Sequence, residues 1–136
     1  MKILYIIESN NKIKVVYDCY EKYLEKSGEV FLNELCLKEL CTKSGRIEAV
    51  KKVFGYKYNV PIFVNQDNIF LKVKANKVAW INIISVGKIY KDNDKVNITF
   101  FSGKVLKVNT GYKNFCKKFK MLDILFDYVK KNVNYN

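Results

Sequence analysis

The sequence contains no histidine, and this absence removes the side chain that most often acts as a general base near neutral pH. Serine or cysteine nucleophiles that depend on a neighbouring imidazole are therefore excluded. The chain also lacks the Gly-rich phosphate-binding loop that ends in Gly-Lys and the glycine fingerprint of dinucleotide-binding folds. We therefore expect a protein that is not an enzyme and that takes neither a cofactor nor a small-molecule substrate.

The sequence also contains few groupings of residues that could bind a metal ion. Without histidine a common zinc ligand is missing, and no two cysteines form a Cys-x-x-Cys pair. Asp92 and Asp94 are the nearest pair of carboxylates. They lie in an Asn-containing turn, where Asp is common because its side chain hydrogen-bonds to the nearby backbone, so a metal is not needed to explain them. We expect no bound metal, and we expect buried free thiols in a reducing compartment at the four cysteines, Cys19, Cys36, Cys41 and Cys116.

Long hydrophobic runs and linkers are absent as well. No apolar stretch approaches the roughly 20 residues of a membrane-spanning helix. The N-terminal run at residues 3–7 ends at Glu8 and is too short for a signal peptide. Proline occurs once and glycine six times, without clustering, and no internal repeat is visible. The sequence predicts a soluble, cytoplasmic protein without a membrane partner, folded as a single domain over residues 1–136.

Acidic residues are scarce, since 13 Asp and Glu face 25 Lys and Arg and leave a net charge of +12. The excess is uneven, because residues 43–77 and residues 104–136 each carry a net charge of +6 whereas residues 1–42 are nearly neutral. A basic excess split between two segments favours one positive surface that faces a polyanion. The alternative is a basic surface that is merely solvated, in a lysine-rich composition typical of AT-rich genomes.

Two pairs of segments show the patterns of hairpins. Residues 2–8 and 12–17 alternate around the turn Ser9-Asn10-Asn11. Residues 96–101 and 104–109 flank a tight turn at Ser102-Gly103. Antiparallel hairpins are therefore the expected unit of the sheet.

Other segments are less regular. Residues 78–86 are apolar on both faces, which indicates a central strand with Trp80 in the core. Residues 20–26 fit either a strand or a helical turn, and Gly28 interrupts this pattern. Residues 34–41 show the spacing of a short helix.

The middle of the chain predicts a helix followed by a hairpin. Apolar residues recur at helical spacing over residues 46–54, with Ser44 and Gly45 in the position of an N-cap and Gly55 where the helix would stop. Residues 61–74 then form two strands around a polar turn.

The last element is predicted as an amphipathic helix of about five turns that starts at Gly111, with Thr110 as its N-cap. One set of lysines falls on a face separate from the apolar stripe: Lys113, Lys117, Lys120 and Lys131. These lysines form either a solvated helix face or a row of phosphate contacts. The predicted fold class is α+β, with an antiparallel hairpin-built sheet, short helices and this C-terminal amphipathic helix.

Residues 43–46, Lys-Ser-Gly-Arg, precede a predicted helix and form the candidate binding site. A helix N-terminus presents unpaired N–H groups and partial positive charge, which suit a phosphate. Gly45 allows close approach to the backbone, and the fork of Arg46 suits a phosphate or a narrow minor groove. The competing interpretation is a simple cap, with Arg46 paired to Glu39 or Glu48.

Several of these segments resemble the ComK family of bacterial competence transcription factors, over about residues 30–129. The order and spacing of the segments carry the resemblance more than any one motif. The similar segments are Ser44-Gly45-Arg46 before a helix, a hairpin from Pro61-Ile62 to Ile69-Phe70-Leu71, Ala79-Trp80-Ile81, Phe100-Phe101-Ser102-Gly103-Lys104 and Gly111-Tyr112-Lys113-Asn114-Phe115.

The resemblance implies a homo-oligomeric protein that binds paired AT-rich boxes in double-stranded DNA, largely through the minor groove, and that activates transcription. Because the sequence ends at Asn136, it resembles a short form without the family's C-terminal extension, and its segment between Leu71 and Trp80 is shorter than the family's. The alternative is a truncated interaction module that pairs with a full-length relative or another protein, without binding DNA itself. A third interpretation is a non-specific or RNA-binding protein. We expect the following DNA contacts: Lys43, Ser44, Gly45, Arg46, Lys51, Lys52, Lys72, Lys74, Lys113, Lys117 and Lys120.

Overall fold

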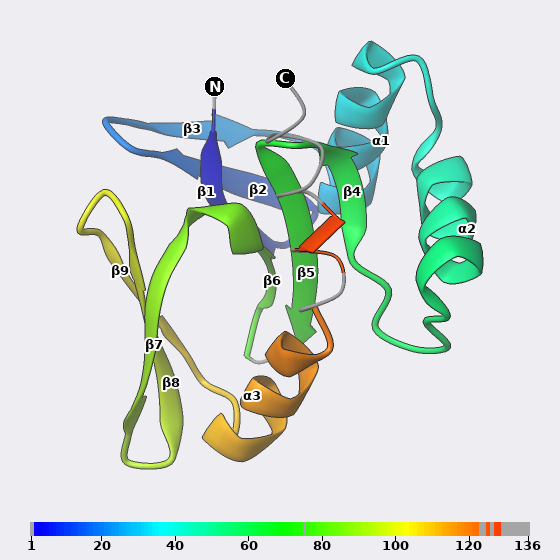
Figure 1. Ribbon diagram of the computed structural model, residues 1–136. Coiled ribbons are helices and arrows are strands. Elements are labelled where there is room, and N and C mark those ends of the chain that lie inside the picture. The colour runs from blue at the N-terminus through cyan, green and yellow to red at the C-terminus, as the bar shows by residue number, and fades with distance from the viewer. Residues whose placement is uncertain (1, 75, 123–124, 126, 129–136) are drawn as a thin grey trace.

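The main sheet consists of two antiparallel meanders that join edge to edge (Figure 1). The computed structural model describes residues 2–74, 76–122, 125 and 127–128. The strands are β1 (Ile3–Ser9), β2 (Lys12–Tyr17), β3 (Glu21–Leu24), β4 (Ile62–Asn65), β5 (Asn68–Lys74) and β6 (Val78–Asn82). Pairing of β1 with β6 joins the meanders in the order β3-β2-β1-β6-β5-β4. The predicted hairpins within each meander are confirmed.

The chain leaves the main sheet through a 3-10 turn, η1 (Ile83–Ser85), and forms a second antiparallel sheet. Its strands are β7 (Val86–Asp92), β8 (Lys95–Phe100) and β9 (Val105–Val108). The prediction of one strand over residues 78–86 is therefore wrong in its second half, since Asn82 Oδ1 accepts a hydrogen bond from Ile84 N–H and turns the chain there. The predicted hairpin at Ser102-Gly103 is confirmed by the pairing of β8 with β9.

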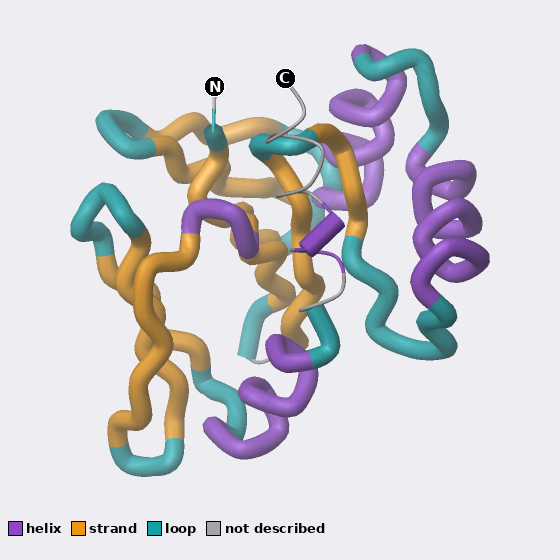
Figure 2. Tube along the Cα trace, viewed as in Figure 1, coloured by secondary structure: helices purple, strands orange, loops and turns teal. Residues whose placement is uncertain are grey.

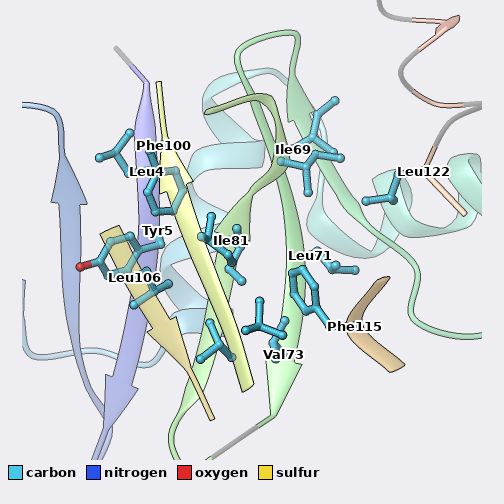
Figure 3. Close-up of a cluster of buried hydrophobic side chains, with 14 of the residues drawn as sticks. Leu4, Tyr5, Ile69, Leu71, Val73, Ile81, Phe100, Leu106, Phe115 and Leu122 are labelled. Carbon is cyan, nitrogen blue, oxygen red and sulfur yellow. The ribbon is translucent and has the colours of Figure 1, made fainter. Parts of the chain in front are cut away.

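Each face of the main sheet is covered by a different layer (Figures 1 and 2). The second sheet and α3 (Tyr112–Lys120) cover one face, and Figure 3 shows Phe115 of α3 close to Leu71 and Val73 of β5. On the other face α1 (Gly28–Lys38) packs over Trp80. The helix α2 (Lys43–Phe54) lies beside α1 along the edge strand β4, with Ile47 against the core under α1 and Val50 in the core of the first face. The α+β fold class is thus confirmed.

The start of α1 is adapted to the indole ring beneath it. A Cβ atom at Gly28 would lie 2.2 Å from the Trp80 ring, so no residue with a side chain fits there without a shift. Ser27 caps the helix, because its Oγ accepts a hydrogen bond from Val30 N–H. The helix therefore begins at the glycine that the pattern marked as an interruption, and the predicted bounds of 34–41 are wrong. Trp80 is 1% exposed, which confirms its place in the core.

The helix α2 begins one turn earlier than its apolar pattern indicates. Thr42 is the N-cap and its Oγ1 accepts a hydrogen bond from Gly45 N–H, so the expected cap by Ser44 and Gly45 is wrong. The C-cap prediction is confirmed, since Gly55 has φ of +74° and its N–H bonds to the carbonyl of Lys51.

The helix α3 is shorter than the predicted C-terminal helix. Its N-cap is Gly111, without a side-chain capping bond, so the expected cap by Thr110 is wrong. Met121 is its C-cap, well before the expected end near residue 131. Lys131 lies outside the described residues. Phe115 is buried against the sheet, in agreement with the predicted apolar face.

Asn82 connects three parts of the fold at the point where the chain leaves the main sheet. Its Nδ2 donates to the carbonyl of Ile3 at 2.7 Å and to that of Asp67 at 2.8 Å, while its Oδ1 accepts from Ile69 N–H at 3.1 Å. The side chain is fully buried, and Asn68 Oδ1 accepts from Ile3 N–H at 3.1 Å beside it. Because a buried polar group is costly without a partner, these bonds specify one arrangement of the strands.

We expect Asn82→Ala to destabilise the protein by about 2–4 kcal/mol, because several buried backbone groups lose their partner together. Urea unfolding at neutral pH measures the effect, with Asn114→Ala on the exposed side of α3 as the matched control. Equal unfolding midpoints for the two variants would contradict a structural role for Asn82.

Candidate functional site

Four lysines from three elements line one pocket of about 360 Å³. Lys43 comes from the first turn of α2, Lys72 and Lys74 from the end of β5, and Lys118 from α3. We call this site the lysine pocket. Its remaining lining residues are Glu29, Ile47, Asn59, Val60 and Ile62. The pocket therefore joins lysines from both segments that carry the basic excess.

Glu29 is the carboxylate of the lysine pocket. Its Oε2 lies 2.7 Å from Lys43 Nζ and its Oε1 lies 3.2 Å from Lys72 Nζ. Burial acts to raise the pKa of Glu29, but the hydrogen bonds and charges of Lys43 and Lys72 outweigh it, so the pKa lies below its ordinary value. Glu29 therefore links the start of α1 to α2 and β5 as an ionised group.

The pleat of β5 explains why a lysine faces the helices. Leu71 and Val73 point into the core shared with the second sheet, so Lys72 between them points to the helix side. Lys72 pairs directly with Trp80 across the sheet, and its Nζ lies 5.6 Å from the centre of the indole ring. Such a contact is favourable for a cation. The ring and Glu29 together hold the Lys72 side chain at the wall of the pocket.

The N-terminus of α2 offers fewer free donors than the sequence indicates. Asn33 Oδ1 accepts a hydrogen bond from Lys43 N–H at 2.9 Å, and Thr42 Oγ1 accepts one from Gly45 N–H at 3.0 Å. Two of the first-turn amides are therefore already bonded within the protein, and the expectation of unpaired N–H groups is wrong for them. The charge that remains available near this helix end comes from side chains rather than from the backbone.

Arg46 lies on the side of α2 away from the lysine pocket. Its guanidinium carbon is 5.9 Å from the centre of the Phe63 ring, and it lines a separate groove with Val50 and Val53. Its Nε is buried and has no hydrogen-bond acceptor among the described residues. Among the described residues Arg46 forms no ion pair with Glu39 or Glu48, because Glu39 accepts a hydrogen bond from Asn65 and Glu48 lies near Lys51. Packing on an aromatic ring is thus the contact that the structure assigns to Arg46.

The other expected lysines fall into two groups. Lys113, Lys117 and Lys120 are exposed along one face of α3, as their spacing indicates. Lys51 and Lys52 lie in the last turn of α2, where positive side chains interact favourably with the helix dipole. Lys118 is not among the DNA contacts expected from the sequence, yet it lines the lysine pocket. Helical spacing shows only that Lys118 lies on a different face of α3 from the other three lysines. Its neighbours in the pocket are distant from it in the sequence.

The described residues can be compared with what the sequence predicts for metal sites, cysteines and membrane spans. In the part of the chain that the structure describes, no group of three or more Cys, Asp or Glu could hold a metal ion. The cysteines are free, but Cys19 is exposed, so the expectation that all are buried is wrong. Burial raises the pKa of the Cys36 thiol. Among the described helices none is long and apolar enough to cross a membrane.

Comparison of the chain with protein-family models, with characterised proteins and with solved structures finds no match. The lysine pocket and the exposed lysine row of α3 are therefore the features from which a function is inferred.

We expect Glu29→Gln to lower stability at neutral pH by at most about 1 kcal/mol, since this ion pair is partly exposed and screened. The folded-state pKa of Glu29 is depressed, so its contribution is complete above the unfolded-state value and is lost as the pH falls through the folded-state pKa. Urea unfolding from about pH 7 to about pH 3 should therefore show the two proteins converging in acid. Glu48→Gln is the control, and a gap that persists unchanged in acid would contradict the assignment.

We expect Arg46→Lys to cost about 0.5–1 kcal/mol of stability and to leave the DNA binding that the sequence predicts unchanged, because the planar group on Phe63 is lost and the charge is kept. Thermal unfolding and a DNA titration measure the two quantities. Lys52→Arg, the reverse change at an exposed position of the same helix, is the control. Lower affinity for AT-rich DNA at unchanged stability would instead place Arg46 in a DNA groove.

Proposed function

We propose that this protein binds double-stranded DNA through the lysine pocket and the exposed row of α3, and that it regulates transcription. The observation that carries the proposal is the meeting of lysines from both basic segments in one pocket. A lysine ammonium is a compact charge that contacts phosphates without reading bases. Lysines gathered from three elements therefore favour a polyanion as the partner over a uniformly solvated surface.

The mode of binding follows from which surfaces are free. The helix α3 buries Phe115 and exposes Lys113, Lys117 and Lys120, so it presents phosphate-binding groups rather than a polar face for base edges. Such a surface suits recognition of the DNA backbone and of DNA shape. We take the preference for paired AT-rich boxes, the homo-oligomeric state, the competence-type activator role and the place at the bacterial nucleoid from the resemblance to the ComK family.

A second candidate is an interaction module that pairs with another protein and does not bind DNA. Apolar side chains exposed on and beside α1 favour it, because Leu40 is 96% exposed and Val30 and Leu37 are half exposed one heptad apart. Gel-shift titrations with AT-rich duplex, GC-rich duplex and RNA distinguish the candidates. A module of this kind would shift none of the three, whereas the proposed regulator would shift AT-rich duplex at the lowest concentration.

We expect the logarithm of DNA affinity to fall with the logarithm of salt concentration at a slope of about −5, as for roughly six neutralised phosphates. Substitution of Lys113, Lys117 and Lys120 by Gln should reduce the steepness by about 3, since each contact releases about one counterion.

The control carries the same loss of charge on the second sheet, with Lys88, Lys91 and Lys95 changed to Gln. It should leave the slope nearly unchanged. A wild-type slope near zero would remove the DNA proposal, and equal effects of the two triple variants would remove the assignment to α3.

A further inference from the structure

The lysine pocket has more positive charge than its own carboxylate satisfies. Glu29 bridges Lys43 and Lys72 at 2.7 Å and 3.2 Å. Lys74 and Lys118 line the same pocket and have no carboxylate partner among the described residues. One carboxylate and four lysines therefore line the pocket, which carries a positive excess.

The two bridged lysines are held in place before any ligand arrives. The side chain of Lys43 is 21% exposed, and Asn33 fixes its backbone at the start of α2. The side chain of Lys72 is 40% exposed and lies over the Trp80 ring. Preorganised donors lose little conformational entropy on binding, so they favour a compact anion. Two ammonium groups that converge on one carboxylate define the place of that anion.

We propose that the lysine pocket binds one phosphate group, at the place where the Glu29 carboxylate bridges Lys43 and Lys72. The inference deepens the proposed function and rests on it insofar as the phosphate belongs to DNA. A terminal phosphate or pyrophosphate has more charged oxygens and a larger negative charge than a carboxylate, so it can bond to Lys74 and Lys118 as well. A phosphodiester of DNA carries one charge, as a carboxylate does, and its two ester oxygens are further acceptors for these lysines. Glu29 is thus an internal competitor that moves aside when the phosphate enters.

Removal of an internal competitor should strengthen phosphate binding, and this direction of change distinguishes a competitor from a residue with an ordinary structural role. Glu29→Gln removes one like charge from the place of the phosphate and leaves a side chain of similar size. We expect phosphate to bind about fivefold more tightly to this variant, the effect of one like charge roughly 4 Å away in water. A residue that only positions the lysines would have the opposite effect, since its loss would weaken binding.

The test uses inorganic pyrophosphate as the probe and the fluorescence of Trp80 as the signal. Trp80 is the single tryptophan, and the Lys72 ammonium lies beside its ring, so movement of that charge changes the emission. We expect a saturable change in the wild type, binding about fivefold tighter in Glu29→Gln and loss of the response in Lys72→Gln. Glu48→Gln, which removes one charge outside the pocket, should change the affinity by less than about twofold because exposed charges are screened.

Lys118→Gln keeps the test sharp if Lys72→Gln fails to fold. It leaves the Trp80 contact intact and should still weaken pyrophosphate binding. The absence of a saturable change in both the wild type and Glu29→Gln overturns the inference. Equal gains in Glu29→Gln and Glu48→Gln also overturn it, since the effect would then be one of net charge.

Duplex DNA then identifies the source of the phosphate. Displacement of pyrophosphate by DNA assigns the pocket to the DNA backbone and supports both proposals. Pyrophosphate binding that DNA does not displace supports the pocket as a site for a free phosphate compound and contradicts its part in DNA binding. DNA affinity that is the same in Glu29→Gln as in the wild type, without pyrophosphate binding, overturns the inference and leaves DNA binding to the exposed lysine row of α3 alone.

Discussion

The buried carboxamide of Asn82 is the constraint on which the arrangement of the strands depends. It bonds the first residue of β1, the turn before β5 and the start of β5 at the position where the chain passes from one sheet to the other. A one-residue slip of β5 would leave these groups unpaired and would turn every side chain of the strand to the opposite face. The register of β5 places Lys72 opposite Trp80, so the polar network at one end of the strand determines the chemistry at the other end.

The lysine pocket forms where the layers that cover the sheet come to their ends. The first turns of α1 and α2 supply Glu29 and Lys43, the end of β5 supplies two lysines, and α3 arrives with Lys118. Apolar side chains cannot fill such a junction completely, so long side chains with charged ends line it instead. A basic site made of several element ends has no continuous motif, and this explains why one stretch of sequence does not contain it.

The hairpins and the core position of Trp80 could be predicted because their signals are local. Asn10 and Asn11 both have positive φ, as the tight hairpin turn requires, and alternation specifies the flanking faces. The cap of α2 could not be predicted, because Thr42 and Ser44 are both suitable caps by residue type, and the helix begins where Asn33, distant in the sequence, accepts a hydrogen bond from Lys43 N–H. The selection of Lys118 over its neighbours depends on how Phe115 packs against the sheet, which spacing on a helix does not reveal.

The N-terminal third of the chain contributes a carboxylate to the lysine pocket. That third is nearly neutral by itself, yet Glu29 from it enters a pocket whose other charged groups are lysines. Without a carboxylate the four ammonium groups would repel one another, and each would need its own hydration in a confined space. One carboxylate bridging two of them relieves this repulsion and leaves a positive excess for an outside anion. Glu29 therefore stabilises the empty pocket, but it would compete with an outside anion for the same lysines. An anion that bonds to all four lysines would reduce their repulsion in place of Glu29.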